Sequence, residues 1–360
     1  MSDGMMKDKK AEDGGQEKKM GEGRAQTEKM GVDARRVEEK RQVLLHARNL
    51  VKEFPAGGTR KNPQVVHAVT NVNLEIYQGE TLALVGESGC GKSTLGRVLI
   101  RLLEPTAGEI HYEGENIVGM GEADFARLRR QMQIIFQDPY ASLNPRMSVK
   151  EIIGEPLITY GMKDKGELEA KVRELMGEVG IAQEFYNRYP HQFSGGQRQR
   201  IGIARAIALN PKLIICDEPV SALDVSIQSQ VLNLLKDLQE RYGLTYLFIS
   251  HDLSVVKFIA DRVCVMFLGM ICEIGDTDSL YEQPLHPYTR FLLNAIPKAD
   301  PKLRSQEKEL LTGEIPSPVN PPSGCRFHTR CPYAEDICRQ KAPEGRMAGE
   351  RQVFCHFPLG

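Results

Sequence analysis

The stretch GESGCGKST, residues 86–94, constrains the fold more than any other part of the chain. It follows the apolar run TLALV and precedes KSTLGRVLIRLL, which has a helical pattern. Gly86, Gly91, Lys92 and Ser93 match G-x-x-x-x-G-K-[ST], a loop whose backbone N–H groups and following helix N-terminus surround phosphate oxygens. In such a loop Lys92 reaches the β- and γ-phosphates of a nucleotide, and the Ser93 hydroxyl ligates Mg²⁺. The residues expected to bind the nucleotide here are Gly86, Glu87, Ser88, Gly89, Cys90, Gly91, Lys92, Ser93 and Thr94.

Strand and helix patterns alternate on both sides of this loop. The runs TLALV, LIIC, YLFIS and VCVMF are continuously apolar, which is typical of buried parallel strands. The stretch SIQSQVLNLLKDLQERYG places Ile227, Val231, Leu234 and Leu238 on one helical face and ends at Gly243. The sequence therefore predicts an α/β domain with a mainly parallel sheet over residues 43–275.

The two ends of the chain have a different composition. Residues 1–42 carry 21 Asp, Glu, Lys and Arg residues and no aromatic residue, which predicts a disordered tail. Residues 276–360 are rich in proline and then in cysteine, and we expect them to form a C-terminal extension. No apolar run approaches the roughly 18 residues that span a bilayer, and the N-terminus lacks the apolar segment of a secretory signal. These features predict a cytosolic protein, and the formal net charge of −1 does not favour nucleic acid as a partner.

Two carboxylates follow the predicted strand in KLIICDEP. Asp217 is expected to hold Mg²⁺ together with Ser93, and Glu218 to polarise the attacking water as a general base. Adjacent carboxylates at the end of a buried strand are costly unless a cation or hydrogen bonds compensate them. The alternative, two acidic residues in a surface turn, fits poorly with so apolar a preceding run. With the glycine-rich loop, this pair predicts a P-loop NTPase.

The stretch QFSGGQRQRIGIARAIALNP contains a second candidate phosphate site. Ser194, Gly195 and Gly196 precede a helix with Gln197 in its first turn, and a serine hydroxyl with glycine amides at a helix N-terminus can bind anions. A serine N-cap without a ligand is the alternative. The stretch resembles the signature of ATP-binding-cassette (ABC) ATPases.

The resemblance implies a site shared between two chains. The signature would cap the γ-phosphate held by the other subunit's P-loop, so that a head-to-tail dimer encloses two ATP molecules. It also implies an ABC-type nucleotide-binding domain over residues 43–275. Such a domain has a RecA-like core, a helical subdomain at about 138–210 and an antiparallel β subdomain.

Other residues match elements of the ABC family in the expected order. The resemblance implies that Phe54 stacks on adenine, that Gln137 contacts Mg²⁺ and the attacking water and senses the transmembrane partner, and that His251 is the switch histidine. Taken alone, the same residues could be a core aromatic, an exposed loop amide and a structural histidine. The resemblance further implies a loop that crosses the dimer interface, formed by Ser221, Ala222, Leu223 and Asp224.

Longer stretches resemble the ATP-binding subunits of bacterial oligopeptide/dipeptide importers, over roughly residues 45–357. They include MQIIFQDPYASLNPRMSVKEII, PLHPYTRFLLNAIP and the extension GEIPSPVNPPSGCRFHTRCPYA. The subfamily also contains nickel and glutathione importers. GKSTLGR and DVSIQSQVLNLLKDLQ favour the F-type of two paralogous ATPase subunits, although a homodimer stays open.

The resemblance also implies partners and a location. These are a second paralogous ATPase subunit, two transmembrane permease subunits and, indirectly, a substrate-binding protein, at the cytoplasmic face of the cell membrane. An exporter subunit is one alternative. A soluble ABC ATPase acting on nucleic acid or ribosomes is another. The single cassette and the lack of a basic stripe disfavour the latter.

Four cysteines gather in the proline-rich tail, where they suggest a metal site. Subfamily members with a similar tail carry [4Fe–4S] clusters, which need four thiolates. Zinc, with nearby His328 and His356, and free thiols are the alternatives, but the C-x₂₋₄-C pairs typical of structural zinc are absent. We expect a structural [4Fe–4S] cluster that holds together a segment too short to build a core. Its predicted ligands are Cys325, Cys331, Cys338 and Cys355.

Overall fold

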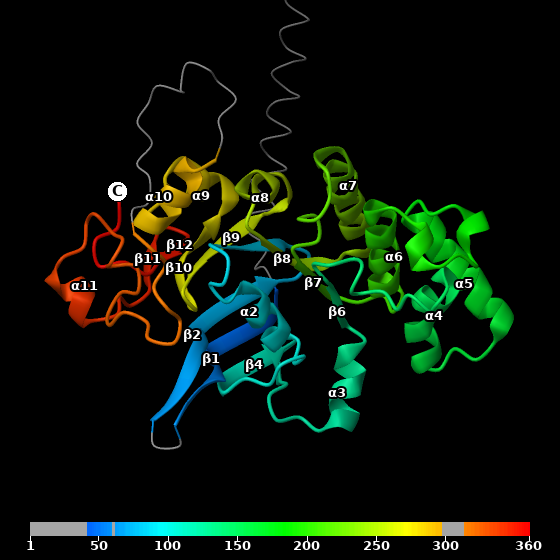
Figure 1. Ribbon diagram of the computed structural model, residues 1–360, viewed down its shortest axis with the longest axis horizontal. Coiled ribbons are helices and arrows are strands. Elements are labelled where there is room, and N and C mark those ends of the chain that lie inside the picture. The colour runs from blue at the N-terminus through cyan, green and yellow to red at the C-terminus, as the bar shows by residue number, and fades with distance from the viewer. Residues whose placement is uncertain (1–41, 60–61, 297–312) are drawn as a thin grey trace, which may run out of the picture. The chain divides into compact units, whose positions relative to one another are not determined.

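The computed structural model describes residues 42–59, 62–296 and 313–360 (Figure 1). The predicted disordered tail, residues 1–42, lies outside the described residues except for Gln42.

A sheet of eight strands forms the centre of the described chain, in the order β11-β12-β10-β9-β3-β8-β7-β6. Neighbouring strands from β9 to β6 are parallel, and β10, β12 and β11 add to one edge in antiparallel fashion. Every residue of β3, β7 and β8 is buried, which explains their uninterrupted apolar sequences. The predicted mainly parallel α/β fold is confirmed. The parallel strands are β3 (Thr81–Val85), β6 (Met132–Ile135), β7 (Leu213–Asp217), β8 (Thr245–Ser250) and β9 (Arg262–Phe267). The antiparallel strands are β10 (Met270–Asp276), β11 (Arg346–Ala348) and β12 (Arg351–Val353).

A second sheet is antiparallel and has the order β2-β1-β4-β5. Helix α2 (Lys92–Leu99) shares one apolar core with both sheets, because Leu95 and Leu99 belong to the same buried cluster as Leu45 of β1 and Leu84 of β3. The helix that follows the P-loop is thereby fixed from two sides. The strands are β1 (Val43–Thr59), β2 (Asn62–Tyr77), β4 (Ala107–Tyr112) and β5 (Glu115–Asn116). Helix α3 (Glu122–Arg129) leads from this sheet to β6.

Helices predominate between β6 and β7 in the sequence, and they form the green group at the right of Figure 1. Ile153 of α4, Met176 of α5 and Ile203 of α6 are buried in one apolar cluster, which holds the three long helices together. The group falls within the predicted helical subdomain, residues 138–210. Its members are α4 (Val149–Thr159), α5 (Lys165–Glu178), η1 (Gln183–Phe185), η2 (Pro190–Gln192) and α6 (Gly195–Ile207).

Helix α7 (Val225–Tyr242) is the amphipathic helix predicted from the sequence. Val231 and Leu238 are buried, Ile227 and Leu234 are partly buried against the same cluster, and Gly243 ends the helix with a left-handed φ of 64°. The later helices are α8 (Leu253–Ile259), α9 (Thr277–Glu282), α10 (Pro287–Asn294) and α11 (Asp336–Gln340). Among the described residues, none of the helices is both long and apolar enough to cross a bilayer.

Candidate nucleotide site

A cavity of about 310 Å³ lies where several parallel strands end. Residues 88–94 of the P-loop line it after β3, Gln137 after β6 and Glu218 after β7. Phe54, on β1, lines the same cavity. Ligands of open α/β sheets bind outside the carboxyl ends of the strands, so this nucleotide cavity has the expected position.

Two glycines of the P-loop allow the backbone to approach its neighbours closely. Gly86 has a φ of 152°, and a Cβ there would lie 2.1 Å from the backbone oxygen of Met266. Gly91 has a φ of 104°, and a Cβ there would lie 2.1 Å from the backbone oxygen of Ala68. No other residue type fits at these two positions without moving the backbone.

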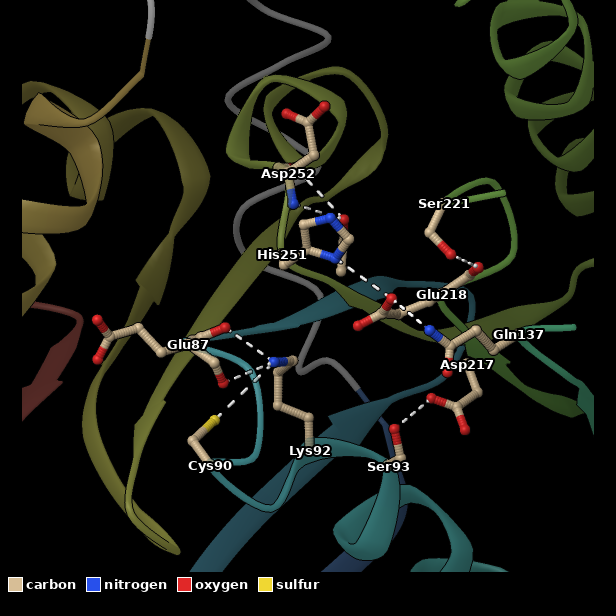
Figure 2. A network of polar contacts seen from close by, with 12 residues as sticks. Glu87, Cys90, Lys92, Ser93, Gln137, Asp217, Glu218, Ser221, His251 and Asp252 are labelled. Atoms are coloured by element: carbon tan, nitrogen blue, oxygen red, sulfur yellow. Dashed lines mark hydrogen bonds and ion pairs between the residues drawn. The ribbon is translucent and has the colours of Figure 1, made fainter. Parts of the chain in front are cut away.

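Lys92 is buried and folded back over its own loop (Figure 2). Its Nζ donates to the carbonyl oxygens of Gly86 at 2.8 Å and of Glu87 at 3.1 Å. The ammonium group thus lies inside the loop that phosphates would enter. Burial raises the pKa of the neighbouring Cys90 thiol, which agrees with a small residue tolerated in the loop.

Ser93 and Asp217, the first two residues expected to hold Mg²⁺, are in contact. The Ser93 Oγ donates to the Asp217 Oδ1 at 2.6 Å, and Asp217 is only 1% exposed. Arg97 of α2, which sequence analysis missed, donates to the Asp217 Oδ2 at 3.3 Å and compensates the buried charge. A hydroxyl and a carboxylate are hard oxygen donors that suit Mg²⁺. The third predicted ligand, Gln137, does not join this pair.

Gln137 instead contacts Glu218, and so does His251 (Figure 2). The Glu218 Oε2 accepts a hydrogen bond from the Gln137 Nε2 at 2.8 Å and lies 3.2 Å from the His251 Nδ1. Glu218 has a φ of 47°, an uncommon conformation for a residue with a side chain that is often found at functional sites. The carboxylate is therefore held from two sides where it lines the nucleotide cavity.

The signature segment, residues 194–197, begins helix α6. Ser194 and Gln197 form a capping box, in which each side chain accepts from the other residue's backbone N–H. Gly196 allows α7 to approach, because a Cβ there would lie 2.3 Å from the Ile227 Cγ2. A Cβ on Gly195 would lie 3.5 Å from the Leu223 Cδ2. The signature segment therefore packs against the loop of residues 221–224 and the helix that follows it.

Neither of these two segments reaches the nucleotide cavity of its own chain. Among the described residues that line the cavity, none belongs to 194–197 or 221–224. Ser221, Ala222 and Asp224 are exposed; the Ser221 Oγ donates to the carbonyl of Glu218 at 3.0 Å, and Asp224 caps α7. The structure thus brings Phe54, the P-loop, Asp217, Glu218, Gln137 and His251 together and leaves the signature elsewhere on the surface.

Three residues of the C-terminal extension reach the nucleotide site, and sequence analysis missed all three. Pro318 lines the cavity. Tyr288 and Arg330 contact Glu87 of the P-loop, 201 and 243 residues away in the sequence. Contacts between such distant segments leave no local pattern that could have revealed them.

Four cysteines of the extension line a second, smaller cavity, here named the cysteine cavity: Cys325, Cys331, Cys338 and Cys355. Burial raises the pKa of the Cys325 and Cys331 thiols to about 11. The two nearby histidines lie 2.8 Å from backbone carbonyl oxygens, His328 from that of Cys325 and His356 from that of Lys341.

The prediction of a [4Fe–4S] cluster gains no direct support here. Across residues 42–59, 62–296 and 313–360, no group of three or more His, Cys, Asp or Glu side chains is arranged to hold a metal ion. The structure brings the four cysteines to one cavity but not into such a group.

Comparison with known proteins identifies two family regions. Residues 69–221 match the family described as ABC transporter, and residues 272–338 match the family described as oligopeptide/dipeptide transporter, C-terminal region. A putative oligopeptide transport ATP-binding protein, YkfD of Bacillus subtilis (strain 168), is 53% identical over 321 residues, which cover 88% of this chain and 96% of the relative.

A second relative and a solved structure indicate the same family. The di/tripeptide transport ATP-binding protein DppF of Pseudomonas aeruginosa (strain UCBPP-PA14) is 49% identical over 316 residues, 88% of this chain and 98% of the relative. A dimeric ATP-binding cassette, MJ0796, bound to ADP and Pi, is 30% identical with a TM-score of 0.59, covering 65% of this chain and 98% of its own. The chain therefore belongs to the family of ABC-type ATP-binding proteins of oligopeptide and dipeptide transporters.

Proposed function

We propose that this chain is the ATPase subunit that binds and hydrolyses ATP to drive import of oligopeptides or dipeptides through partner transmembrane subunits. The observation that carries the proposal is the Glu218 carboxylate, held by Gln137 and His251 at the edge of a nucleotide cavity. Similarity over nearly their whole length to relatives named as oligopeptide and di/tripeptide transport proteins supports the peptide cargo.

Nucleotide binding uses the two sides of the cavity. The Phe54 ring, with the Lys52 Nζ 4.9 Å from its centroid, provides a flat apolar surface for adenine. The P-loop amides and the α2 N-terminus bind the phosphates, and Lys92 exchanges its loop carbonyls for phosphate oxygens. Ser93 and Asp217 would hold Mg²⁺, which would neutralise charge on the phosphates.

Hydrolysis uses the residues around Glu218. The carboxylate accepts a proton from the water that attacks the γ-phosphate, and His251 and Gln137 fix its orientation. A general base of this kind contributes about 10²- to 10⁴-fold to the rate.

The other wall of the site comes from a second chain. The signature segment is exposed at Ser194 and lies outside the nucleotide cavity of its own chain, which supports a role in capping the partner's γ-phosphate. We propose that the partner is a paralogous ATPase subunit, with a homodimer as the alternative. Mass analysis of the complex purified on a tagged form of this chain distinguishes the two.

The proposed location is the cytoplasmic face of the membrane, reached through two permease subunits that receive cargo from a substrate-binding protein. Purification of the tagged chain in detergent tests this. Recovery of two membrane proteins supports the proposal, whereas recovery of ribosomes or DNA contradicts it. The cargo is tested in vesicles that contain the purified complex. ATP-dependent accumulation of a tripeptide other than glutathione supports peptide cargo. Accumulation of only Ni²⁺ or only glutathione contradicts the peptide cargo and indicates a nickel or glutathione importer.

The cysteine cavity is proposed to hold a [4Fe–4S] cluster with a structural role. Four cysteines line this one cavity, and a [4Fe–4S] cluster takes four thiolate ligands. Zinc is less well supported, because the C-x₂₋₄-C pairs typical of structural zinc are absent from the sequence. Anaerobic purification followed by iron, sulfide and zinc analysis tests this proposal. Protein with neither iron nor sulfide refutes it.

A further inference from the structure

We propose that Arg330 and Tyr288 are positioning residues of the P-loop, through which the C-terminal extension sets the affinity for ATP. The inference rests on the proposed ATP site and assigns the extension a role in nucleotide binding.

The ion pair of Arg330 with Glu87 is the first observation. The Arg330 NH1 and NH2 nitrogens donate to the two carboxylate oxygens of Glu87 at 2.7 and 3.1 Å. The Arg330 side chain is only 6% exposed, and that of Glu87 is 23% exposed. A paired, two-bond contact of this kind fixes direction as well as distance, and lysine cannot reproduce it.

Glu87 is held at two further points. Its backbone N–H donates to the hydroxyl of the buried Tyr288 at 2.9 Å, and its carbonyl oxygen accepts from the Lys92 Nζ at 3.1 Å. Glu87, one of the two residues whose carbonyls accept from the Lys92 ammonium group, is thus fixed by two side chains of the extension. A change at Arg330 or Tyr288 therefore shifts the backbone that positions Lys92.

The segment that carries Arg330 is itself anchored. Phe327 is buried, with its ring centroid 5.3 Å from that of Phe267 on β9 and 5.2 Å from that of Tyr288 on α10. Arg326 donates to the carbonyl of Leu268 and, at 3.1 Å, to the Thr70 hydroxyl. The extension thus presents Arg330 from a packed segment rather than from a free loop.

The ion pair between Arg330 and Glu87 affects ATP affinity through its charge. Glu87 lies in the loop that surrounds the phosphates, so an unpaired carboxylate there repels the triphosphate. Arg330 compensates that charge. The extension makes a second contact with the nucleotide site at Pro318, which lines the same cavity as Phe54. The Pro318 carbonyl accepts from the backbone N–H of His67 at 3.0 Å.

The test is a pair of substitutions in the full-length protein with its partners. Arg330→Ala is expected to weaken ATP binding about tenfold, within the range usual for coupled sites, with a smaller change in kcat. In the Glu87→Gln background, Arg330→Ala is expected to weaken ATP binding less than about twofold, because no carboxylate charge is left for Arg330 to compensate. The exposed Arg339 of the same extension provides the matched control, Arg339→Ala.

Equal weakening by Arg330→Ala in both backgrounds would overturn the charge argument and reduce Arg330 to a packing residue. Tyr288→Phe removes the hydroxyl that receives the Glu87 N–H and keeps the ring. It is expected to raise the KM for ATP, and an unchanged KM would remove Tyr288 from the proposal. If the unsubstituted protein binds no ATP, the proposed function fails, and not this inference alone.

Discussion

The substitution Gly196→Ala tests whether the signature segment packs against α7. An added Cβ would lie 2.3 Å from the Ile227 Cγ2, whereas carbon atoms in favourable contact lie about 3.5–4.0 Å apart. Ile227 is β-branched and strongly prefers one rotamer in a helix, so it does not rotate away freely. Overpacking of this kind costs about 1–3 kcal/mol, and we expect Gly196→Ala to lower the free energy of unfolding by that amount.

The Ile227→Ala background removes the clash between the Cβ added at position 196 and the Ile227 Cγ2. In Ile227→Ala the opposing methyl group is gone, so Gly196→Ala should instead gain up to about 1 kcal/mol of helix propensity. The two effects have opposite signs, and the coupling between positions 196 and 227 should be about 1–4 kcal/mol. Urea unfolding of the two single variants and the double variant measures it.

Gly202 provides the control within the same helix. A Cβ there would meet nothing within 4 Å, so Gly202→Ala should be neutral or stabilising by up to about 1 kcal/mol. A coupling below about 0.5 kcal/mol between positions 196 and 227 would refute the argument that Gly196 is required by the approach of α7.

Three further substitutions test separate parts of the site. Lys92→Ala should weaken binding of a fluorescent ATP analogue at least about tenfold, because it removes a charged phosphate contact; unchanged affinity would place the phosphates elsewhere. Ser93→Ala should raise the Mg²⁺ concentration for half-maximal ATPase activity, because it removes the hydroxyl beside Asp217 that would ligate Mg²⁺; an unaltered Mg²⁺ titration would contradict the predicted ligand. Cys331→Ala should lower the iron content of anaerobically purified protein, with Cys264→Ala, in the buried sheet, as the comparison.

Much of the fold follows from local sequence. The strands β3, β7, β8 and β9 are predicted because both of their faces are buried, which leaves continuous apolar runs. The P-loop is predicted because its glycines serve close backbone approaches that no other residue allows. Asp217 and Glu218 follow from their place at the end of a buried strand.

Other features depend on distant segments. Strand β12 has the sequence RQV, which lacks a strand pattern, and it forms because β10 offers a free edge. The hydrogen bond from Gln137 to Glu218 joins the segments that follow β6 and β7, which lie 81 residues apart in the sequence. The pairing of Arg330 with Glu87 depends on the packing of Phe327, which no local pattern encodes.

The most direct test of the shared ATP site is the behaviour of Glu218→Gln with ATP and Mg²⁺, alone and with the paralogous subunit. Sedimentation and nucleotide analysis should show ATP-dependent pairing of two chains that retain unhydrolysed ATP, with turnover reduced by about 10² or more. A Glu218→Gln chain that stays monomeric and hydrolyses ATP at the unsubstituted rate would contradict both the general base and the two-chain site.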